Sequence, residues 1–244
     1  MLNPPICRIG GKSKLRKSII DLIPEHICYI ELFFGAGWVY FGKKPSDAEV
    51  INDVDKELVN LFKMIKYHSP EIERLLEYEF SGRDIFEEYK NYDVNYLTEI
   101  HRAIRFLYLI NQSFAGKGKT YGYATSKKPS QKIFKGILGD IKERLSNTYV
   151  ENLSFEKIID KYDRENSFFF CDPPYFETAG YEHKFGEEEH IVLRDKLKKL
   201  KGKFLLTIND HEKVREWYKE FNIREVEVNY SVSRVAEGRE NIRN

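Results

Sequence analysis

Cysteine is scarce in this chain: Cys7, Cys28 and Cys171 are the only three among 244 residues. No two of them form a CxxC pair, so the sequence predicts neither a disulfide framework nor a structural zinc site. Long apolar runs are also absent, and the first residues lack the apolar core of a signal peptide. Because a membrane helix needs about 20 apolar residues, these absences argue against a membrane protein and favour a cytoplasmic one.

Two common nucleotide-binding patterns are missing as well. The sequence has no GxxxxGK[ST] motif, which argues against a Walker-type nucleotide hydrolase, and no full GxGxxG motif, which disfavours a dinucleotide cofactor. A shorter glycine pattern is present at residues 10–13 (GGKS), just ahead of a predicted helix. Backbone N–H groups and a lysine at such a position indicate a site for phosphate or carboxylate.

The composition is that of a folded protein. Hydrophobic residues make up 41% of the chain and aromatic residues 14%. The length predicts one large domain, or one domain with a sizeable insertion. A net charge of +1 does not decide whether nucleic acid binds, because a local basic patch can contact phosphates while the average stays neutral.

Strand-like and helix-like segments alternate along most of the chain, which predicts an α/β fold with a largely parallel sheet. Asp55 is the expected N-cap of the second helix. Strands are predicted at residues 28–34, 48–53, 149–153, 167–171, 203–208 and 223–230, and helices at 13–23, 55–67, 187–200 and 211–220. Residues 70–146 are mostly helical and polar and interrupt this alternation, so an inserted helical subdomain is expected there.

A glycine-bearing turn follows the first predicted strand, at residues 31–37 (ELFFGAG). Gly35 and Gly37 would allow the backbone to approach a ligand closely. Asp53 stands some sixteen residues further on, at the end of the next predicted strand. A carboxylate in that place can accept hydrogen bonds from both ribose hydroxyls of a nucleoside-containing cofactor. A turn acid or helix cap is the alternative interpretation of Asp53.

The tetrad Asp172-Pro173-Pro174-Tyr175 follows a buried strand directly. Two prolines have fixed φ angles and no N–H donors, so their carbonyls and the Asp172 carboxylate are held as acceptors at the carboxyl edge of the sheet. Tyr175 adds a flat ring that can stack on a base. An exocyclic aromatic amine is a poor nucleophile, and two acceptors that grip its hydrogens would free the lone pair for methyl transfer.

Basic side chains gather inside the predicted insertion. Residues 117–144 carry eight lysines and arginines against two acids, together with aromatic residues and glycines. Lysines neutralise phosphates, and aromatic loop residues can reach bases. The candidates for DNA contact are Lys117, Lys119, Tyr121, Lys127 and Lys128. A solvated lysine-rich loop is the alternative.

With GGK, FxGxG, ND, a helical insertion and DPPY in this order, the chain resembles the D12 class of DNA adenine methyltransferases, which includes the Dam-like enzymes. The similarity runs over nearly the whole length. The resemblance implies a Rossmann-like sheet that uses S-adenosyl-L-methionine, with residues 1–64 and 147–244 as the catalytic domain. Residues 65–146 would then be the helical target-recognition insertion, and double-stranded DNA the partner.

The resemblance also implies roles for single residues. Arg8, Lys12 and Phe34 would contact S-adenosylmethionine, and Gly35 and Gly37 would approach its methionine portion. Asp53 would hold the ribose. Asp172 would touch both cofactor and target amine, within a catalytic set formed by Asp172, Pro173, Pro174 and Tyr175. The family extracts the target base from the duplex, and no metal is needed because the sulfonium supplies the driving force.

The family pattern leaves some properties open. The segment at 111–118 (NQSFAGKG) only loosely resembles the arginine-bearing loop of GATC-specific relatives, so no GATC target is implied. Relatives usually carry one further strand, which would begin near Asn244. A cognate restriction endonuclease is one candidate partner, since restriction–modification enzymes occur in this family.

Other activities compete with adenine methylation as interpretations of the sequence. N4-cytosine methylation uses the same chemistry, although such enzymes more often have serine in place of Asp172; a DNA-binding relative without catalysis is a second alternative. Protein glutamine methylation usually shows asparagine there. Cytosine C5 methylation needs a thiolate after a proline, and the sequence has no Pro-Cys dipeptide.

Overall fold

Five parallel strands form one sheet in a computed structural model that describes residues 1–8, 12–123, 136–177 and 185–226. The spatial order is β3-β2-β1-β4-β5. The strands are β1 (Cys28–Glu31), β2 (Ala48–Asn52), β3 (Thr148–Glu151), β4 (Ser167–Cys171) and β5 (Lys203–Leu206). The predicted Rossmann-like α/β class is confirmed. The chain runs outward from β1 through β2 to β3 and then returns to β4, so the direction of winding reverses between β1 and β4.

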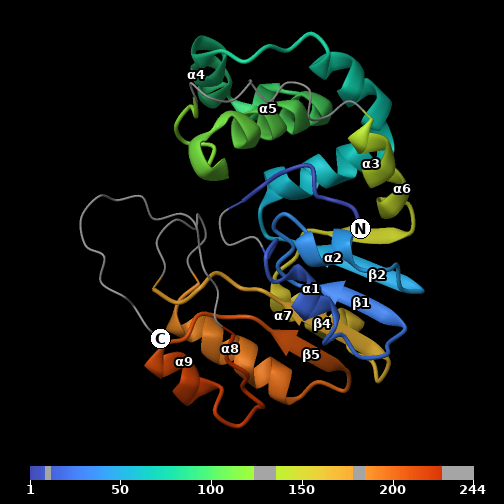
Figure 1. Cartoon of the computed structure of the whole chain (residues 1–244), viewed down its shortest axis with the longest axis vertical. Coiled ribbons are helices and arrows are strands. Elements are labelled where there is room, and N and C mark those ends of the chain that lie inside the picture. Colours follow the sequence, from blue (N-terminus) through green and yellow to red (C-terminus); the bar gives the residue numbers. More distant parts are fainter. Residues whose placement is uncertain (9–11, 124–135, 178–184, 227–244) are drawn as a thin grey trace.

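Helices cover both faces of the sheet (Figure 1). Successive side chains of a strand point to opposite faces, which gives the sheet two separate hydrophobic cores. Tyr29, Ile51 and Phe170 face a core that includes α1 (Arg16–Ile20), α2 (Trp38–Gly42), α3 (Lys56–Leu76), α5 (Glu99–Gln112) and α6 (Ile137–Leu145). Ile30 and Phe169 face a core shared with α7 (Phe155–Tyr162), α8 (Glu187–Lys198) and α9 (Glu212–Trp217).

Several elements differ from the sequence prediction. The predicted helix at 13–23 is shorter, and α7 was not predicted. Asp55 is the N-cap of α3 as expected, because its side chain accepts hydrogen bonds from the backbone N–H groups of Glu57 and Leu58. α3 runs past the predicted end because non-helical angles at His68 accommodate the bend that precedes Pro70. Residues 223–226 form no strand, and the rest of the strand predicted at 223–230 lies outside the described residues.

The helices of the predicted insertion pack continuously against the rest of the fold. Its proposed boundary at 64/65 falls inside α3, which packs against α5 and α6. In Figure 1, α3 leads away from the sheet toward α5 and α4 (Arg83–Asn91). Short 3-10 turns lie on either side of α5, at Val94–Tyr96 and Phe114–Gly116. The helical layer therefore shares a core with the sheet at one end and extends beyond it at the other.

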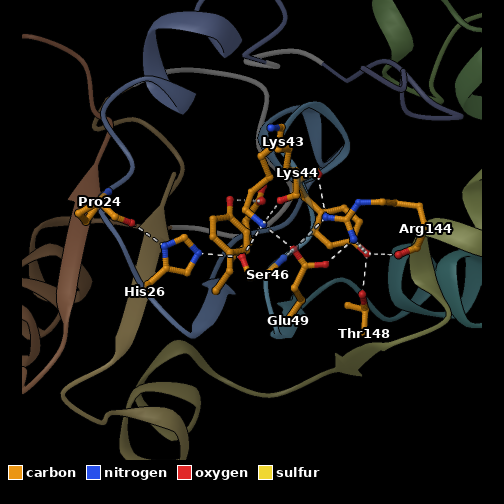
Figure 2. A network of polar contacts seen from close by, with 11 residues as sticks. Pro24, His26, Lys43, Lys44, Ser46, Glu49, Arg144 and Thr148 are labelled. Carbon is orange, nitrogen blue, oxygen red and sulfur yellow. Dashed lines mark hydrogen bonds and ion pairs between the residues drawn. The ribbon is translucent and has the colours of Figure 1, made fainter.

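A buried carboxylate on β2 ties this helical layer to the sheet (Figure 2). Glu49 is 3% exposed and accepts from Lys43 Nζ at 2.5 Å and from the Arg144 guanidinium of α6. Arg144 also stacks on the Tyr40 ring, and the Tyr40 hydroxyl donates to the Arg144 carbonyl oxygen at 2.8 Å. Two cations compensate the burial of one carboxylate, so the network fixes α2 and α6 on β2.

In the part of the chain that the structure describes, every helix is too short or too polar to cross a bilayer.

Candidate active site at the carboxyl edge of the sheet

The ends of β1, β2 and β4 bring the predicted motifs together. Parallel strands point their carboxyl ends to one edge, and open α/β sheets bind ligands at that edge where the winding reverses. Glu31 pairs with Phe170 in register, and the Leu32 N–H donates to the Phe170 carbonyl at 3.1 Å. One step further along, the glycine turn and the tetrad come to lie at neighbouring strand ends. The switch point between β1 and β4 is therefore lined by both motifs.

Asp53 is held against the glycine turn by backbone donors. The Gly35 N–H donates to its Oδ2 at 2.9 Å, and the Asp55 N–H donates to its Oδ1 at 3.0 Å. Gly35 and Gly37 both have left-handed φ angles, +51° and +75°. A Cβ at Gly37 would lie 2.4 Å from the Phe34 ring, so a side chain there would also collide. The turn therefore requires glycine at both positions.

A small pocket lies beside Asp53. It is lined by Phe34, Ile51, Asn52, Asp53, Leu58, Val59, Phe62, Val150 and Glu151. Phe34 is 4% exposed and packs edge-on against Phe62, with ring centroids 4.8 Å apart. Burial raises the pKa of Asp53, while the N–H donors of Asp55 and Gly35 oppose that rise. Two carboxylates, Asp53 and Glu151, border a wall that is otherwise mostly apolar, a combination that suits the ribose and the base of a nucleoside.

The tetrad lies at the end of β4, and its acid faces a buried lysine. Lys12 Nζ is 2.6 Å from the Asp172 carboxylate and 4.8 Å from the centre of the Tyr175 ring. The Lys12 side chain is only 4% exposed. Burial raises the pKa of Asp172, and the Lys12 ammonium and the Thr207 hydroxyl act against that rise. Lys12, which the resemblance assigns to the cofactor, thus lies directly beside the DPPY tetrad.

Arg8, which the resemblance assigns to the cofactor, pairs with an acid of the protein. Its guanidinium donates to Asp55 Oδ2 at 2.9 Å and lies 5.6 Å from the centre of the Phe106 ring. Asp55 is also the N-cap of α3, so the pair anchors the N-terminal segment to that helix. Arg8 consequently contacts an acid two residues beyond Asp53, and one of its N–H groups is already engaged there.

Glu31 is a buried acid at this edge of the sheet to which the sequence analysis assigned no role. It is the last residue of β1, is 3% exposed, and accepts from the Tyr29 hydroxyl at 2.8 Å. Burial, opposed in part by that hydrogen bond, raises the pKa of Glu31 to about 8, and nearby Asp172 adds to the rise. An acid in an otherwise apolar strand, directly before the glycine turn, was the signal that could have identified it.

The described part of the basic segment projects from the end of α5. Lys117 and Lys119 are exposed, whereas Tyr121 is half-buried and packs on Phe86. Arg83 lies over the rings of Tyr121 and of Tyr123, which is 75% exposed. Lys127 and Lys128 lie outside the described residues. Arg83 is therefore an exposed group beside these rings that sequence reasoning did not single out.

The end of α5 and the turn after it touch the N-terminal segment that carries Arg8. Gly116 has φ +67°, and a Cβ there would lie 2.0 Å from the Cys7 carbonyl oxygen. Asn111 donates to the Pro5 carbonyl at 3.5 Å. Lys117 and Lys119 are thus held on the side of the molecule where the N-terminal segment leads into the site.

The fold and the site define the class of protein. The sheet has the topology of a Rossmann-like methyltransferase. An acid follows β2, and a DPPY tetrad follows β4 at the switch point. A family model described as D12 class N6 adenine-specific DNA methyltransferase matches residues 9–232. The chain belongs to this family.

Named relatives agree with the family match. The chain is 30% identical over 244 residues to the type II methyltransferase M1.LlaDCHI of Lactococcus lactis subsp. cremoris, with 89% of this chain and 85% of that protein covered. It is 27% identical to the type II methyltransferase M.CviBI of a Paramecium bursaria Chlorella virus, over 94% and 91% of the two chains. It is 24% identical to the DNA adenine methylase of Escherichia coli, over 92% and 87%.

A buried histidine, His190, is expected to make the stability of the fold depend on pH. His190 on α8 is 0% exposed, stacks on Trp217 and meets Phe185 edge-on. Burial lowers the pKa of His190 to about 4, although Glu189 and the Pro174 backbone act in the opposite direction. An unfolded histidine has a pKa of about 6.5, so between these values the unfolded chain binds more protons than the folded one.

Stability is therefore expected to be complete above about pH 6.5 and to fall as the pH drops toward 4, by about 2–3 kcal/mol from this group alone. Denaturant unfolding of His190→Gln at a series of pH values should show a flatter curve than the parent. The same substitution at the exposed His68 controls for the loss of an imidazole. Parallel curves for parent and His190→Gln would contradict this assignment.

Proposed function

We propose that the chain binds S-adenosyl-L-methionine along the ends of β1 and β2 and methylates N6 of an adenine held by residues 172–175. The observation that carries the proposal is the position of the Asp172 carboxylate, at the switch point and next to the glycine turn. The Asp53 carboxylate suits the ribose hydroxyls of this cofactor. Each Asp53 oxygen accepts one backbone N–H and retains a lone pair for a ribose hydroxyl.

S-adenosylmethionine, when bound, supplies an electrophilic methyl group on a sulfonium. The residues of the tetrad prepare the amine that attacks it. Asp172 and a proline carbonyl of the tetrad would accept hydrogen bonds from the two N6–H groups, so that the nitrogen lone pair is withdrawn from the purine ring and can face the methyl group. As the N6–CH3 bond formed, the bond from that methyl to sulfur would break to leave a neutral thioether, and N6 would lose one proton. The Lys12 ammonium, 2.6 Å from Asp172, favours the ionised carboxylate that can accept such a bond. Tyr175 stacks on the base.

The target base has to leave the duplex to reach these acceptors. N6 of a paired adenine is engaged in Watson–Crick pairing, and Tyr175 needs access to a base face. We therefore include base flipping in the proposal, with residues 65–146 as the target-recognition region. The proposed DNA contacts are the exposed Lys117 and Lys119 and the partly buried Tyr121. They also include Lys127 and Lys128, which lie outside the described residues.

Methyl transfer from labelled S-adenosylmethionine to DNA, followed by mapping of the modified bases, tests the proposal. We expect label on N6 of adenine within one short recognition sequence. Label on N4 of cytosine would support the alternative specificity, and DNA binding without any transfer would support a relative that has lost catalysis. We also propose a restriction endonuclease partner that cuts the mapped sequence, because three relatives are named type II methyltransferases.

The proposed lysine contacts predict a change in salt dependence. Removing one lysine–phosphate pair should lower the slope of log affinity against log salt by about 1, because one fewer counterion is released. DNA binding of Lys117→Ala and Lys119→Ala, measured at several salt concentrations, should show this on every DNA sequence. Lys198→Ala is the control, since Lys198 lies at the far end of α8 and pairs with Glu220. Slopes equal to that control would place the DNA elsewhere.

A further inference from the structure

In the segment after β5, every second side chain from 207 to 211 contacts the tetrad or the residue that follows it. Thr207 Oγ1 donates to Asp172 Oδ1 at 2.8 Å. Asn209 accepts from the Phe176 N–H at 3.0 Å through Oδ1 and donates to the Phe176 carbonyl at 3.1 Å through Nδ2. His211 meets the Phe176 ring edge-on, with centroids 5.1 Å apart. Residues 207, 209 and 211 face the same way because side chains alternate along an extended chain.

The register of the sheet explains why these contacts form. β4 and β5 pair in parallel as far as Cys171 with Leu206, and the Thr207 N–H then donates to the Cys171 carbonyl at 2.9 Å. The next residue of each strand is consequently Asp172 on one side and Thr207 on the other. The acid of the tetrad thus leaves the sheet beside a hydroxyl that is fixed by the same ladder of hydrogen bonds.

The two ends of the tetrad are held by different groups. Thr207 fixes the carboxylate at its start, and Asn209 fixes the backbone of Phe176 directly after its end. Asn209 makes both bonds with one side-chain amide, so it satisfies the Phe176 N–H and carbonyl as the backbone of a paired strand would. Glu177, the next residue, has a left-handed φ of +55°, an uncommon angle for a side chain other than glycine. The chain therefore turns sharply at the point where the Asn209 clamp ends.

We propose that Thr207 and Asn209 are positioning residues that set the Asp172 carboxylate and the tetrad carbonyls in the orientation needed to accept the amine hydrogens. This inference rests on the proposed function, because it assumes that Asp172 acts on the amine. A carboxylate offers about four lone-pair sites, so the bonds from Thr207 and Lys12 leave room for an N6 hydrogen. Because Thr207 contacts the reacting acid, its hydroxyl acts on the methyl-transfer step rather than on DNA affinity.

The test compares Thr207→Val with Thr207→Ser. Loss of the hydroxyl should lower kcat by about 10-fold, with little change in DNA affinity, because the contact matters most in the transition state. It should also move the acidic limb of the kcat profile to higher pH by about 0.5–1 unit, since the charged carboxylate loses one hydrogen bond. Thr207→Ser should restore both. The charged groups that face Asp172, namely Lys12 and Glu31, are unchanged in these variants.

Ser167→Ala is the matched control for a removed hydroxyl. Ser167 begins β4, at the opposite edge of the sheet from Asp172, and its Oγ donates to the Tyr162 carbonyl at 2.7 Å. It should lower stability without moving the pH profile. If Thr207→Val does not fold, Thr207→Ala carries the same comparison. Asn209→Asp, which keeps the acceptor and loses the donor, should lower kcat in the same way.

The outcomes separate this inference from the function it assumes. An inactive parent protein would contradict both the proposed function and this inference. An active parent, with kcat and pH profile unchanged in the Thr207 variants and in Asn209→Asp, would overturn the positioning role alone. A Thr207→Val defect that Thr207→Ser does not correct would also overturn it, because the hydroxyl would not be the cause.

Discussion

Asp172→Ala is expected to lower kcat for DNA methylation by about 100-fold or more. In the proposed mechanism the carboxylate accepts a hydrogen bond from the amine as that nitrogen attacks, so the loss of the carboxylate should act mainly on the transition state. Affinity for S-adenosylmethionine should change far less. Single-turnover methylation with labelled cofactor, alongside calorimetric cofactor binding, measures the two effects separately.

A second, more conservative variant of Asp172 is needed because of the buried lysine beside it. Lys12 Nζ lies 2.6 Å from this carboxylate in a nearly closed environment, so alanine removes a charge that compensates a buried ammonium. Asp172→Asn keeps the shape and one acceptor oxygen and should show an intermediate kcat. Thermal unfolding of both variants establishes whether they are folded. Turnover near that of the parent in a folded Asp172→Ala protein would refute the assignment of this residue.

Asp53→Ala is expected to weaken S-adenosylmethionine binding by about 2–4 kcal/mol, which corresponds to roughly 30- to 1,000-fold in Kd. The expected loss is large because charge-assisted hydrogen bonds to both ribose hydroxyls would disappear together. Isothermal titration calorimetry measures it directly. Asp53→Asn, which retains one acceptor oxygen, should fall between the alanine variant and the parent.

Asp55→Ala provides the matched control for this variant. Asp55 is two residues away, caps α3 and pairs with Arg8, so its loss should cost about 1 kcal/mol of stability. It holds no expected ribose contact, and cofactor affinity should be much less affected than in Asp53→Ala. Equal affinity for S-adenosylmethionine in Asp53→Ala and in the parent would mean that Asp53 only stabilises the turn through its bond from the Gly35 N–H.

The local chemistry of the motifs was readable from the sequence because each motif depends on neighbours in the chain. Two prolines after an apolar strand predicted a rigid strand end at 173–174. The glycine turn required Gly35 and Gly37, and both have positive φ. Asp55 was recognised as the cap of α3, since an N-cap acts on residues two and three positions ahead.

The contacts of Lys12 and Arg8 could not be predicted in this way. Lys12 meets Asp172 across 160 positions, and Arg8 meets Asp55 across 47. No local propensity encodes which of several acids a lysine or arginine will reach. The same reason explains Glu31: its raised pKa follows from burial and from nearby Asp172, neither of which a strand pattern specifies.

The sequence alone determined the α/β class, the order of the motifs and the residue types that methyl transfer to an amine requires. These follow from short-range periodicity, turn chemistry and family-specific spacing. Tertiary structure alone decided how β4 and β5 align, and therefore that Thr207 stands beside Asp172. Strand register is set by the packing of whole faces against helices, so the partners of a catalytic acid emerge only when the sheet is assembled.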